Sequence, residues 1–292
     1  MQHGLPTFDL QSHSSHSDGA LTPSAVVAAA AGAGVELLAL TDHDTVDGVP
    51  EAAQAASALG LRLVPAVEIS AIDSERGDLH VLGYLIDDRA RAFREALVSF
   101  RSDRGRRAEV MIEKLRLLGF QLDRAALENR ARLGRPIGRP HLADAVVAHP
   151  ANRARLVAEG CLERSRFLER YLVEGAPAFE SRLVPTVVDA IDAIHAAGGV
   201  AVWAHPFWDE QAPEVVGPTV ERFAESGLDG VECFYPTHTR HQSELLAGQC
   251  KALALLSTGS SDFHGPEHGL FSRFRAFKTY GLEAALGPLA HP

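Results

Sequence analysis

The stretch VELLALTDHDT, residues 35–45, contains the two features that decide the predicted fold. Its first seven residues form an apolar run of the kind found in buried parallel strands. The polar triplet Asp-His-Asp follows directly, where such a strand would end. Further apolar runs predict strands at Thr7–Leu10, Leu61–Ile69, Leu79–Leu85, Gly199–Ala204, Gly230–Phe234 and Ala254–Ser257.

Helical patterns separate most of these predicted strands. Thr22 and Pro23 suit the N-cap and first turn of a helix that continues through Ala25–Ala33. Strands that alternate with helices predict an α/β protein with a parallel sheet, open or closed. The length of 292 residues suits one barrel of roughly 250 residues plus an insertion. Further helices are predicted at Val49–Leu59, Val187–Ala197, Pro218–Ser226 and Ser243–Lys251.

The middle of the chain differs in character from both ends. Residues 90–181 are rich in Arg, Glu, Leu and Ala at helical spacing and contain no convincing strand. We therefore predict that residues 1–89 and 182–292 form the barrel. Residues 90–181 are predicted to form an inserted helical subdomain that covers the active site.

The composition narrows the class of protein. A formal net charge of −10 gives no reason to expect broad electrostatic attraction to nucleic acid. The three cysteines are far apart and the first ten residues do not resemble a signal peptide, which predicts a cytoplasmic protein with reduced thiols. The longest apolar run, Ala25–Ala33, is too short to span a bilayer.

Many of the candidate metal ligands occupy one kind of position, at the end of a predicted strand or directly after it. They are His13, Asp18, Asp42, His43, Asp44, Glu68, His205, Asp262 and His264. In a parallel α/β barrel the carboxyl ends of the strands converge on one face, where active sites form. His80 is the exception, because it begins its strand, as an antiparallel return from Glu68 would place it. Any one of these residues could instead be a turn residue or helix cap, but together they indicate a shared site.

The chemistry of this set points to metal-assisted hydrolysis. Imidazole and carboxylate ligands without cysteine suit Zn, Mn or Fe. Two such ions about 3.5–4 Å apart can activate water and stabilise the leaving oxygen of a phosphoester.

Six ordered motifs span both halves of the chain: DLQSHSSHSDGAL (9–21), ALTDHDT (39–45), PAVEIS (65–70), LHVLGY (79–84), WAHP (203–206) and GSSDFHG (259–265). They resemble the polymerase-and-histidinol-phosphatase (PHP) family, in particular its bacterial branch of nucleoside 3',5'-bisphosphate phosphatases and a 5'-to-3' exoribonuclease. The resemblance implies a distorted seven-stranded (β/α) barrel with two to three divalent metal ions, Mn, Fe or Zn. The ligands implied by motif position are Gln11, His13, Asp18, His43, Glu68, His80, His205, Asp262 and His264.

Gln11 is a departure from the family pattern, which opens with DLHxH. It replaces the first histidine by an amide, whose oxygen can bind a metal but is neutral and weaker than imidazole for these ions. We therefore expect one metal position to be weak, completed by water or filled by a different ion. His16, three residues after His13, would either compensate in part or contact the substrate phosphate.

The inserted segment carries a cluster of arginines at positions 101, 104, 106 and 107, followed by the motif Gly-Arg-Pro-His at 138–141. An arginine-rich helix can be a solvated face, but a guanidinium also suits bidentate contact with phosphate. The related phosphatases use a similar cluster for substrate. The resemblance therefore implies substrate-binding roles for Arg104, Arg107, Arg139 and His141.

The expected reaction is hydrolysis of phosphomonoesters by metal-activated water, on nucleotides such as nucleoside 3',5'-bisphosphates. His205, His16 and Asp44 are the catalytic candidates, and a protonated His205 or His16 would assist the leaving group. The expected partner is a small nucleotide or a short oligoribonucleotide, with no membrane and no stable nucleic-acid partner. One alternative is a 5'-to-3' exonuclease that acts on short RNA with the same site. A second is a catalytically impaired metal-binding regulatory protein, and a histidinol-phosphatase-like role fits the motifs less well.

Overall fold

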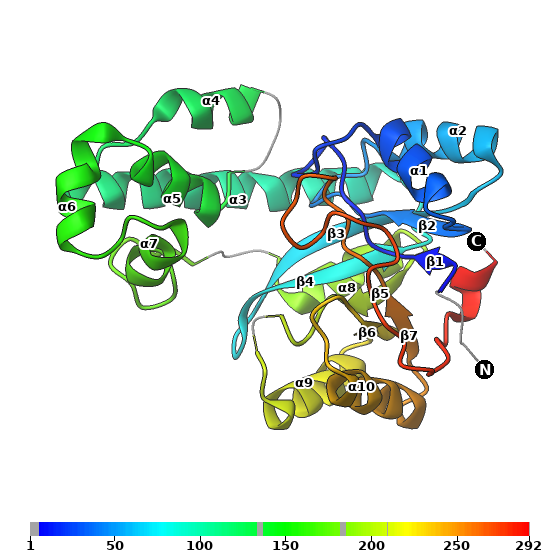
Figure 1. Ribbon diagram of the computed structural model, residues 1–292. Coiled ribbons are helices and arrows are strands. Elements are labelled where there is room, and N and C mark those ends of the chain that lie inside the picture. The colour runs from blue at the N-terminus through cyan, green and yellow to red at the C-terminus, as the bar shows by residue number, and fades with distance from the viewer. Residues whose placement is uncertain (1–5, 133–136, 182–184, 209, 292) are drawn as a thin grey trace. The chain divides into compact units, whose positions relative to one another are not determined.

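The computed structural model describes residues 6–132, 137–181, 185–208 and 210–291 (Figure 1). The chain divides into two compact units, one made of Met1–Val98 with Pro185–Pro292 and the other of Ser99–Val184. The domain boundaries predicted from the sequence, after residues 89 and 181, and the covering role of the inserted segment remain predictions. We describe each unit by itself.

The first unit is a nearly closed seven-stranded barrel, which confirms the predicted fold class. The strands adjoin one another in chain order, from β1 to β7. Beyond β1 the backbone continues beside the end of β7, where Leu10 N–H donates to the Gly259 carbonyl at 3.2 Å and His13 N–H to the Phe263 carbonyl at 2.8 Å. The strands are β1 (Phe8–Asp9), β2 (Leu37–Leu40), β3 (Arg62–Asp73), β4 (Gly77–Tyr84), β5 (Val200–Trp203), β6 (Gly230–Phe234) and β7 (Leu256–Gly259).

One strand, β4, runs against all the others and distorts the barrel. It pairs antiparallel with both β3 and β5, whereas the remaining neighbours pair in parallel. Only three residues connect β3 to β4, too few for the helical crossover that parallel strands need. In this register Ser70 pairs with His80, so the predicted antiparallel return from Glu68 is confirmed.

Helices surround the barrel and bury its outer face. Helices α1 and α2 lie beside β2 and β3, while α8, α9 and α10 lie against β4 to β7 (Figure 1). As predicted, Thr22 caps α1, its side chain accepting from Ala25 N–H. Two predicted starts were wrong, because Pro213 and the capping box of Thr239 with Gln242 begin α9 and α10 earlier than Pro218 and Ser243. The helices are α1 (Pro23–Gly32), α2 (Val49–Leu59), α8 (Val187–Ala196), α9 (Pro213–Glu225) and α10 (Arg240–Ala252), with a short 3-10 turn η2 at Gly287–Ala290.

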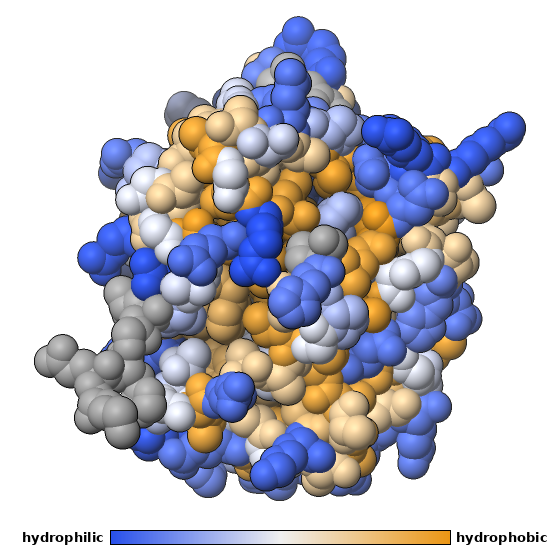
Figure 2. All heavy atoms as spheres, turned by 90° about the vertical axis from the view of Figure 1, so that its right-hand side faces the viewer, coloured by the Kyte–Doolittle hydropathy of each residue, from blue (hydrophilic) through white to orange (hydrophobic). Residues whose placement is uncertain are grey.

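Apolar side chains fill the barrel interior below the ends of the strands. Leu10, Val64, Leu82 and Val202 are completely buried there. Tyr84 is buried beside them and its hydroxyl donates to the Leu10 carbonyl at 2.8 Å. On the face of the molecule in Figure 2, hydrophobic residues reach the surface between polar and charged ones.

The second unit is helical, and its described residues contain no strand. It has a core of its own, in which Phe120, Phe167 and Tyr171 meet with ring centroids 4.9–5.2 Å apart. Among the described helices of either unit, none is long and apolar enough to cross a membrane. The helices are α3 (Arg91–Leu117), which begins before the unit boundary, α4 (Arg124–Arg132), α5 (Arg139–Val147), η1 (Pro150–Asn152), α6 (Arg153–Ala158) and α7 (Arg164–Tyr171).

Candidate metal centre

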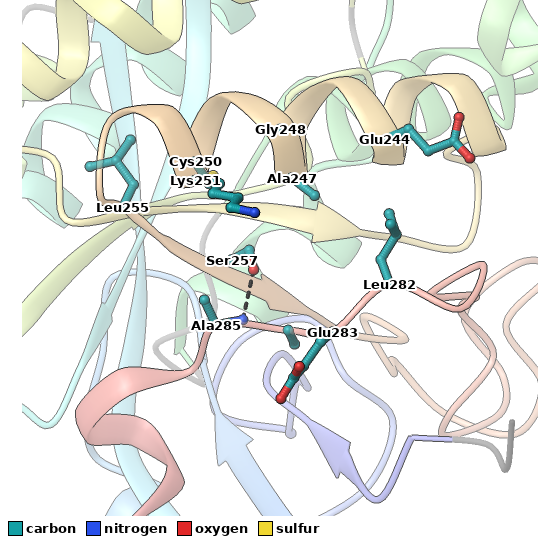
Figure 3. Close-up of a pocket in the computed structure, with 11 residues that line it drawn as sticks. Glu244, Ala247, Gly248, Cys250, Lys251, Leu255, Ser257, Leu282, Glu283 and Ala285 are labelled. Atoms are coloured by element: carbon teal, nitrogen blue, oxygen red, sulfur yellow. Dashed lines mark hydrogen bonds between the residues drawn. The ribbon is translucent and has the colours of Figure 1, made fainter.

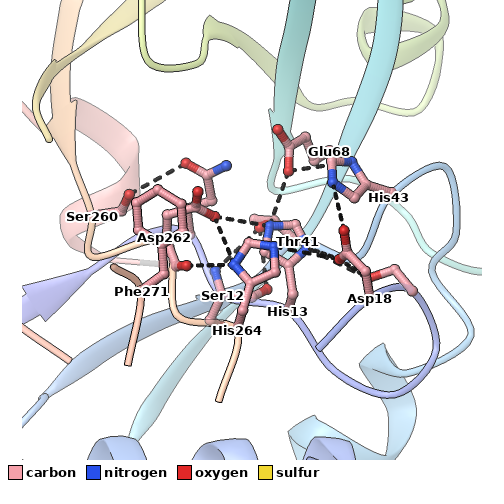
Figure 4. A network of polar contacts seen from close by, with 12 residues as sticks. Ser12, His13, Asp18, Thr41, His43, Glu68, Ser260, Asp262, His264 and Phe271 are labelled. Carbon is pink, nitrogen blue, oxygen red and sulfur yellow. Dashed lines mark hydrogen bonds and ion pairs between the residues drawn. The ribbon is translucent and has the colours of Figure 1, made fainter. Parts of the chain in front are cut away.

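Glu68 lies at the middle of a cluster of histidines at one end of the barrel (Figure 4). Its Oε2 atom is 3.0 Å from His13 Nε2 and 3.5 Å from His43 Nδ1. Its Oε1 atom is 2.7 Å from His80 Nδ1 and 3.3 Å from His205 Nε2. Each carboxylate oxygen therefore faces two imidazoles, an arrangement that suits a bridging ligand.

Asp18 and Asp262 complete the cluster on the side of the β1 and β7 loops. Asp18 lies 3.5–3.6 Å from nitrogen atoms of His13, His43 and His264. One ligand atom from each of these four residues lies within 4.8 Å of the others, and the same holds for His43, Glu68 and His80. Asp262 Oδ1 lies 3.1 Å from His13 Nε2.

Several polar atoms within this cluster are buried and have no hydrogen-bond partner. They are His13 Nε2, His43 Nδ1, Glu68 Oε2 and Asp262 Oδ1, and Gln11 Nε2 is likewise buried without a partner. Buried polar atoms in proteins almost always have a partner. Nitrogen and oxygen atoms that converge without one fit a divalent cation, so the residues present suit a metal centre.

The protonation of these groups follows from burial and from their mutual contacts. Burial alone would raise the pKa of Glu68, but His43 and His80 hold it well below its usual range. Burial also lowers the pKa of His43 to about 4, which leaves this ring neutral at pH 7 and able to act as a ligand. Burial would lower the pKa of His13 as well, but Asp262 and Glu68 raise it well above normal. The low pKa values of Glu68 and His43 favour the ionised carboxylate and the neutral imidazole, the forms in which these groups bind a metal.

Backbone strain accompanies several of these positions. Asp44, His205 and Asp262 have φ values of 54°, 31° and 52°, in the left-handed region that costs a non-glycine residue about 1–3 kcal/mol. Asp44 Oδ1 accepts from Ser70 N–H at 2.9 Å, and Asp44 N–H donates to the Glu68 carbonyl at 2.8 Å. These contacts place Asp44 as a support for the segment that carries Glu68, and its catalytic role remains a prediction.

Asp42, which the sequence indicated only as a candidate metal ligand, organises the loop after β1. Its carboxylate accepts from Ser14 N–H at 2.7 Å, from Ser14 Oγ at 2.6 Å and from Ser17 Oγ at 2.6 Å. These hydrogen bonds hold the turn between His13 and Asp18.

Glu232 and Tyr235 were also missed. Glu232 is completely buried, and its Oε2 accepts from His205 N–H at 2.9 Å. The Tyr235 hydroxyl donates to Asp262 Oδ2 at 2.7 Å. The available signal for Glu232 was a charged residue in the apolar stretch GVECF.

The remaining predicted residues of the barrel unit lie as follows. Gln11 is completely buried, with its Oε1 3.3 Å from Ser260 Oγ. His16 is exposed on the loop after β1, and its backbone N–H donates to Ser14 Oγ at 3.2 Å.

The predicted substrate residues all belong to the second unit. The side chain of Arg104 lies outside the described residues. Arg107 is buried, donates from Nε to the Glu180 carbonyl at 2.6 Å and lies 5.3 Å from the centre of the Phe179 ring. Arg139 begins α5, where His141 Nδ1 accepts from Gly138 N–H at 3.0 Å. The substrate contacts of all four residues remain a prediction.

A separate hollow of about 570 Å³ lies beside α10 and the start of β7 (Figure 3). Leu255, Leu282 and Lys251 are among its lining residues, and none of the candidate metal ligands is. Two residues of the metal cluster, Asp262 and His264, come instead after the carboxyl end of β7.

Known proteins resemble this chain over nearly its whole length. Residues 9–129 match the PHP domain family. A 5'-3' exoribonuclease from Haemophilus influenzae is 34% identical over 260 residues, which cover 89% of this chain and 90% of the relative. A 3',5'-nucleoside bisphosphate phosphatase from Chromobacterium violaceum is 32% identical and covers 91% and 90% of the two chains. A phosphoribosyl 1,2-cyclic phosphate 1,2-diphosphodiesterase from Eggerthella lenta is 33% identical and covers 88% and 94%.

Two solved structures share the fold. An amidohydrolase from Chromobacterium violaceum with bound sulfate and no metal superposes with a TM-score of 0.73, at 31% identity, over 90% of this chain and 89% of its own. A metal-dependent phosphoesterase from Bifidobacterium adolescentis, described as putative, gives a TM-score of 0.72 at 29% identity, with 91% of both chains covered.

Proposed function

This chain belongs to the PHP family and is a metal-dependent phosphoesterase, and we propose that it removes phosphate from nucleotides. Nucleoside 3',5'-bisphosphates are the first proposed substrates. Short 5'-phosphorylated RNA, cleaved from its 5' end, is the second. The names of the relatives support both substrates, since they include a bisphosphate phosphatase and an exoribonuclease.

Two to three divalent ions, Mn, Fe or Zn, are proposed to act in the cytoplasmic enzyme. The proposed ligands are Gln11, His13, Asp18, His43, Glu68, His80, His205, Asp262 and His264. When bound, such ions lower the pKa of water and neutralise charge on phosphoryl oxygens. The unpartnered inward-facing atoms of His13, His43, Glu68 and Asp262 support this assignment.

The residues around the ligands have supporting tasks in this proposal. Tyr235 donates to the outer oxygen of Asp262, which leaves Oδ1 facing His13. Glu232 holds the backbone of His205. His205 and the exposed His16 are the proposed proton donors to the leaving oxygen, and Arg104, Arg107, Arg139 and His141 are the proposed phosphate contacts.

The observation that carries the nucleotide assignment is an aromatic cluster beside the metal ligands. Trp208 is 41% exposed, and its ring lies 5.6 Å from Phe271 and 6.1 Å from Tyr235. Tyr235 lies 5.3 Å from His205, and Phe271 lies 5.7 Å from His264. The exposed ring of Trp208 therefore offers a stacking surface for a base whose phosphate lies at the metals, a purpose that a sugar phosphate without a base would not need.

Product release with Mn²⁺ tests this proposal on a nucleoside 3',5'-bisphosphate, a short 5'-phosphorylated oligoribonucleotide and ribose 5-phosphate. Inorganic phosphate is measured for the bisphosphate and the sugar phosphate, and nucleoside 5'-monophosphate is measured for the oligonucleotide. We expect kcat/KM to be highest for the bisphosphate, lower for the oligonucleotide and lowest for the sugar. A higher kcat/KM for the oligonucleotide would favour the exonuclease. Absence of any hydrolysis product from all three in the Mn-loaded protein would favour the metal-binding regulatory alternative.

Trp208→Ala separates the base from the phosphate. Stacking is worth about 1–3 kcal/mol per base, so KM for the bisphosphate should rise about tenfold or more while that for ribose 5-phosphate stays unchanged. Val188→Ala is the control, because Val188 is exposed to a similar degree on α8. An equal rise in KM for both substrates would contradict the stacking role.

A further inference from the structure

The amide of Gln11 makes an unsatisfactory set of hydrogen bonds in the orientation described above. Its Oε1 lies 3.3 Å from Ser260 Oγ, while its buried Nε2 has no partner. Ser260 Oγ also lies 2.5 Å from Glu232 Oε1. Ser260 can donate to only one of these two acceptors, or Glu232 can be protonated and donate to Ser260, but in either case the buried Gln11 Nε2 has no partner.

A half-turn of the Gln11 amide gives its nitrogen a hydrogen-bond partner. The oxygen and nitrogen of a glutamine side chain have nearly the same shape, and their assignment rests on the hydrogen bonds around them. After the turn, Gln11 Nε2 donates to Ser260 Oγ, and Ser260 donates to Glu232 Oε1. The other oxygen of Glu232 already accepts from His205 N–H. The Gln11 oxygen then takes the place of the unpartnered nitrogen.

The place thus taken faces the metal cluster. Gln11 and His13 are two residues apart in backbone that continues the β1 ladder, so their side chains point to the same side. On that side His13 Nε2 meets Glu68 Oε2 and Asp262 Oδ1, at 3.0 and 3.1 Å (Figure 4). All three atoms are buried and lack a hydrogen-bond partner, as Gln11 Nε2 does. A cation there would be repelled by an amide N–H and attracted by an amide oxygen.

We infer that Gln11 binds a divalent ion through its amide oxygen, together with His13, Glu68 and Asp262, and that Ser260 and Glu232 hold the amide in this orientation. The inference rests on the metal centre proposed above. This ligand set has three oxygens and one nitrogen. It is therefore harder than a set with two imidazoles, and this shifts its relative affinity from Zn²⁺ toward Mn²⁺. Ser260 and Glu232 act as positioning residues.

Metal binding, measured without turnover, tests the ligand. Chelator-treated protein is titrated with Mn²⁺ while free Mn²⁺ is followed by its EPR signal, and bound Zn²⁺ is counted by elemental analysis in competition. Gln11→Leu should lose one bound Mn²⁺ per chain. Gln11→His should keep the site and shift its preference toward Zn²⁺ by about tenfold or more. Unchanged Mn²⁺ stoichiometry and affinity in Gln11→Leu would overturn the inference.

The orienting role is tested by Ser260→Ala. Removal of such a partner commonly weakens metal affinity 10–100-fold, and we expect a loss in this range at one site. Ser257→Ala is the matched control, because it removes a buried hydroxyl of β7 that accepts from Ala285 N–H. In the Gln11→Leu background Ser260→Ala should have no further effect on Mn²⁺ binding. An equal loss in both backgrounds would refute the orienting role.

The outcomes distinguish this inference from the proposed function. If Mn²⁺ binds as expected but no nucleotide is hydrolysed, the proposed function fails and the role of Gln11 stands. If nucleotides are hydrolysed and Gln11→Leu binds every ion as the wild type does, only the role of Gln11 fails. Tryptophan fluorescence of each variant, from Trp203 and Trp208 in the barrel unit, checks that the barrel is folded.

Discussion

Asp42→Ala is expected to destabilise the barrel unit even in the absence of metal. Asp42 is 2% exposed and accepts three hydrogen bonds from Ser14 and Ser17. Hydrogen bonds to a charged acceptor contribute about 1.5–3 kcal/mol each, and their effects are not additive. Truncation also leaves the Ser14 N–H without an acceptor. We therefore expect a loss of about 3–5 kcal/mol, a large share of the ~5–15 kcal/mol typical of folded proteins.

Asp42→Asn should have a milder effect, because its amide keeps one acceptor oxygen for Ser14 N–H. Ser17 Oγ can continue to donate to that same oxygen, and the Ser14 hydroxyl, which faces the other oxygen of Asp42, can rotate to accept from the new amide group. We expect a loss of about 1–2 kcal/mol.

Urea unfolding of chelator-treated protein measures these changes, with tryptophan fluorescence as the signal. Both tryptophans belong to the barrel unit, so the signal does not report on the helical unit. With a slope of about 2 kcal/mol per molar urea, Asp42→Ala should lower the midpoint by about 1.5–2.5 M.

Asp47→Ala is the control for Asp42→Ala. Asp47 lies in the same loop but its side chain is 47% exposed, where it pairs with Arg94. Such surface pairs contribute about 0–1 kcal/mol. If Asp42→Ala shifts the midpoint no further than Asp47→Ala does, the proposed organisation of this loop is wrong.

Three further outcomes are expected. Burial lowers the pKa of His238 to about 4, whereas its value in the unfolded chain is about 6.5. As the pH falls, the unfolded chain therefore binds the proton first. The folded state should lose about 3 kcal/mol of stability between pH 6.5 and pH 4. His238→Asn, which retains a donor to the Cys233 carbonyl, should flatten this part of a stability–pH curve, and an unchanged slope would exclude His238 as its cause. Burial alone would raise the pKa of Asp73, but the two hydrogen bonds from Arg222 lower it. These hydrogen bonds therefore stabilise the folded state at pH values above the pKa that Asp73 has in the unfolded chain. This stabilisation is lost as the pH falls through the pKa that Asp73 has in the folded state. Arg222→Gln should therefore cost about 2 kcal/mol at pH 7 and progressively less toward pH 3 in urea unfolding, whereas a pH-independent cost would indicate lost packing. Chelator treatment should lower the melting temperature by several degrees and Mn²⁺ should restore it, and a melting temperature indifferent to both would argue against the metal centre.

The strands and the helices of the barrel were largely predictable because their signals are local. The apolar runs at Val35–Thr41 and Leu61–Ile69 correspond to β2 and to much of β3. Their exact ends were not predictable, since β3 continues to Asp73 through pairing with β4. The starts of α9 and α10 were predicted too late, because Pro218 and Ser243 lie inside these helices and do not begin them.

The position of the candidate ligands was predictable for a different reason. A side chain that follows a parallel strand must lie at the carboxyl end of the sheet, wherever that strand falls in the order. His43 and Asp262 reach the cluster in this way. Contacts such as Glu232 with the backbone of His205, and Tyr235 with Asp262, depend on the register between strands. Nothing in the local sequence specifies that register.

The sequence by itself determined that this chain forms an α/β barrel and which imidazoles and carboxylates gather at one end of it, because strand periodicity and chain order suffice for that. Only the tertiary structure decided that each oxygen of Glu68 faces two histidines, that Asp42 holds the loop after β1, and that Gln11 lies against Ser260. These facts depend on distances of about 3 Å between residues far apart in the chain. Barrel closure sets such distances, and no pattern of neighbouring residues contains them.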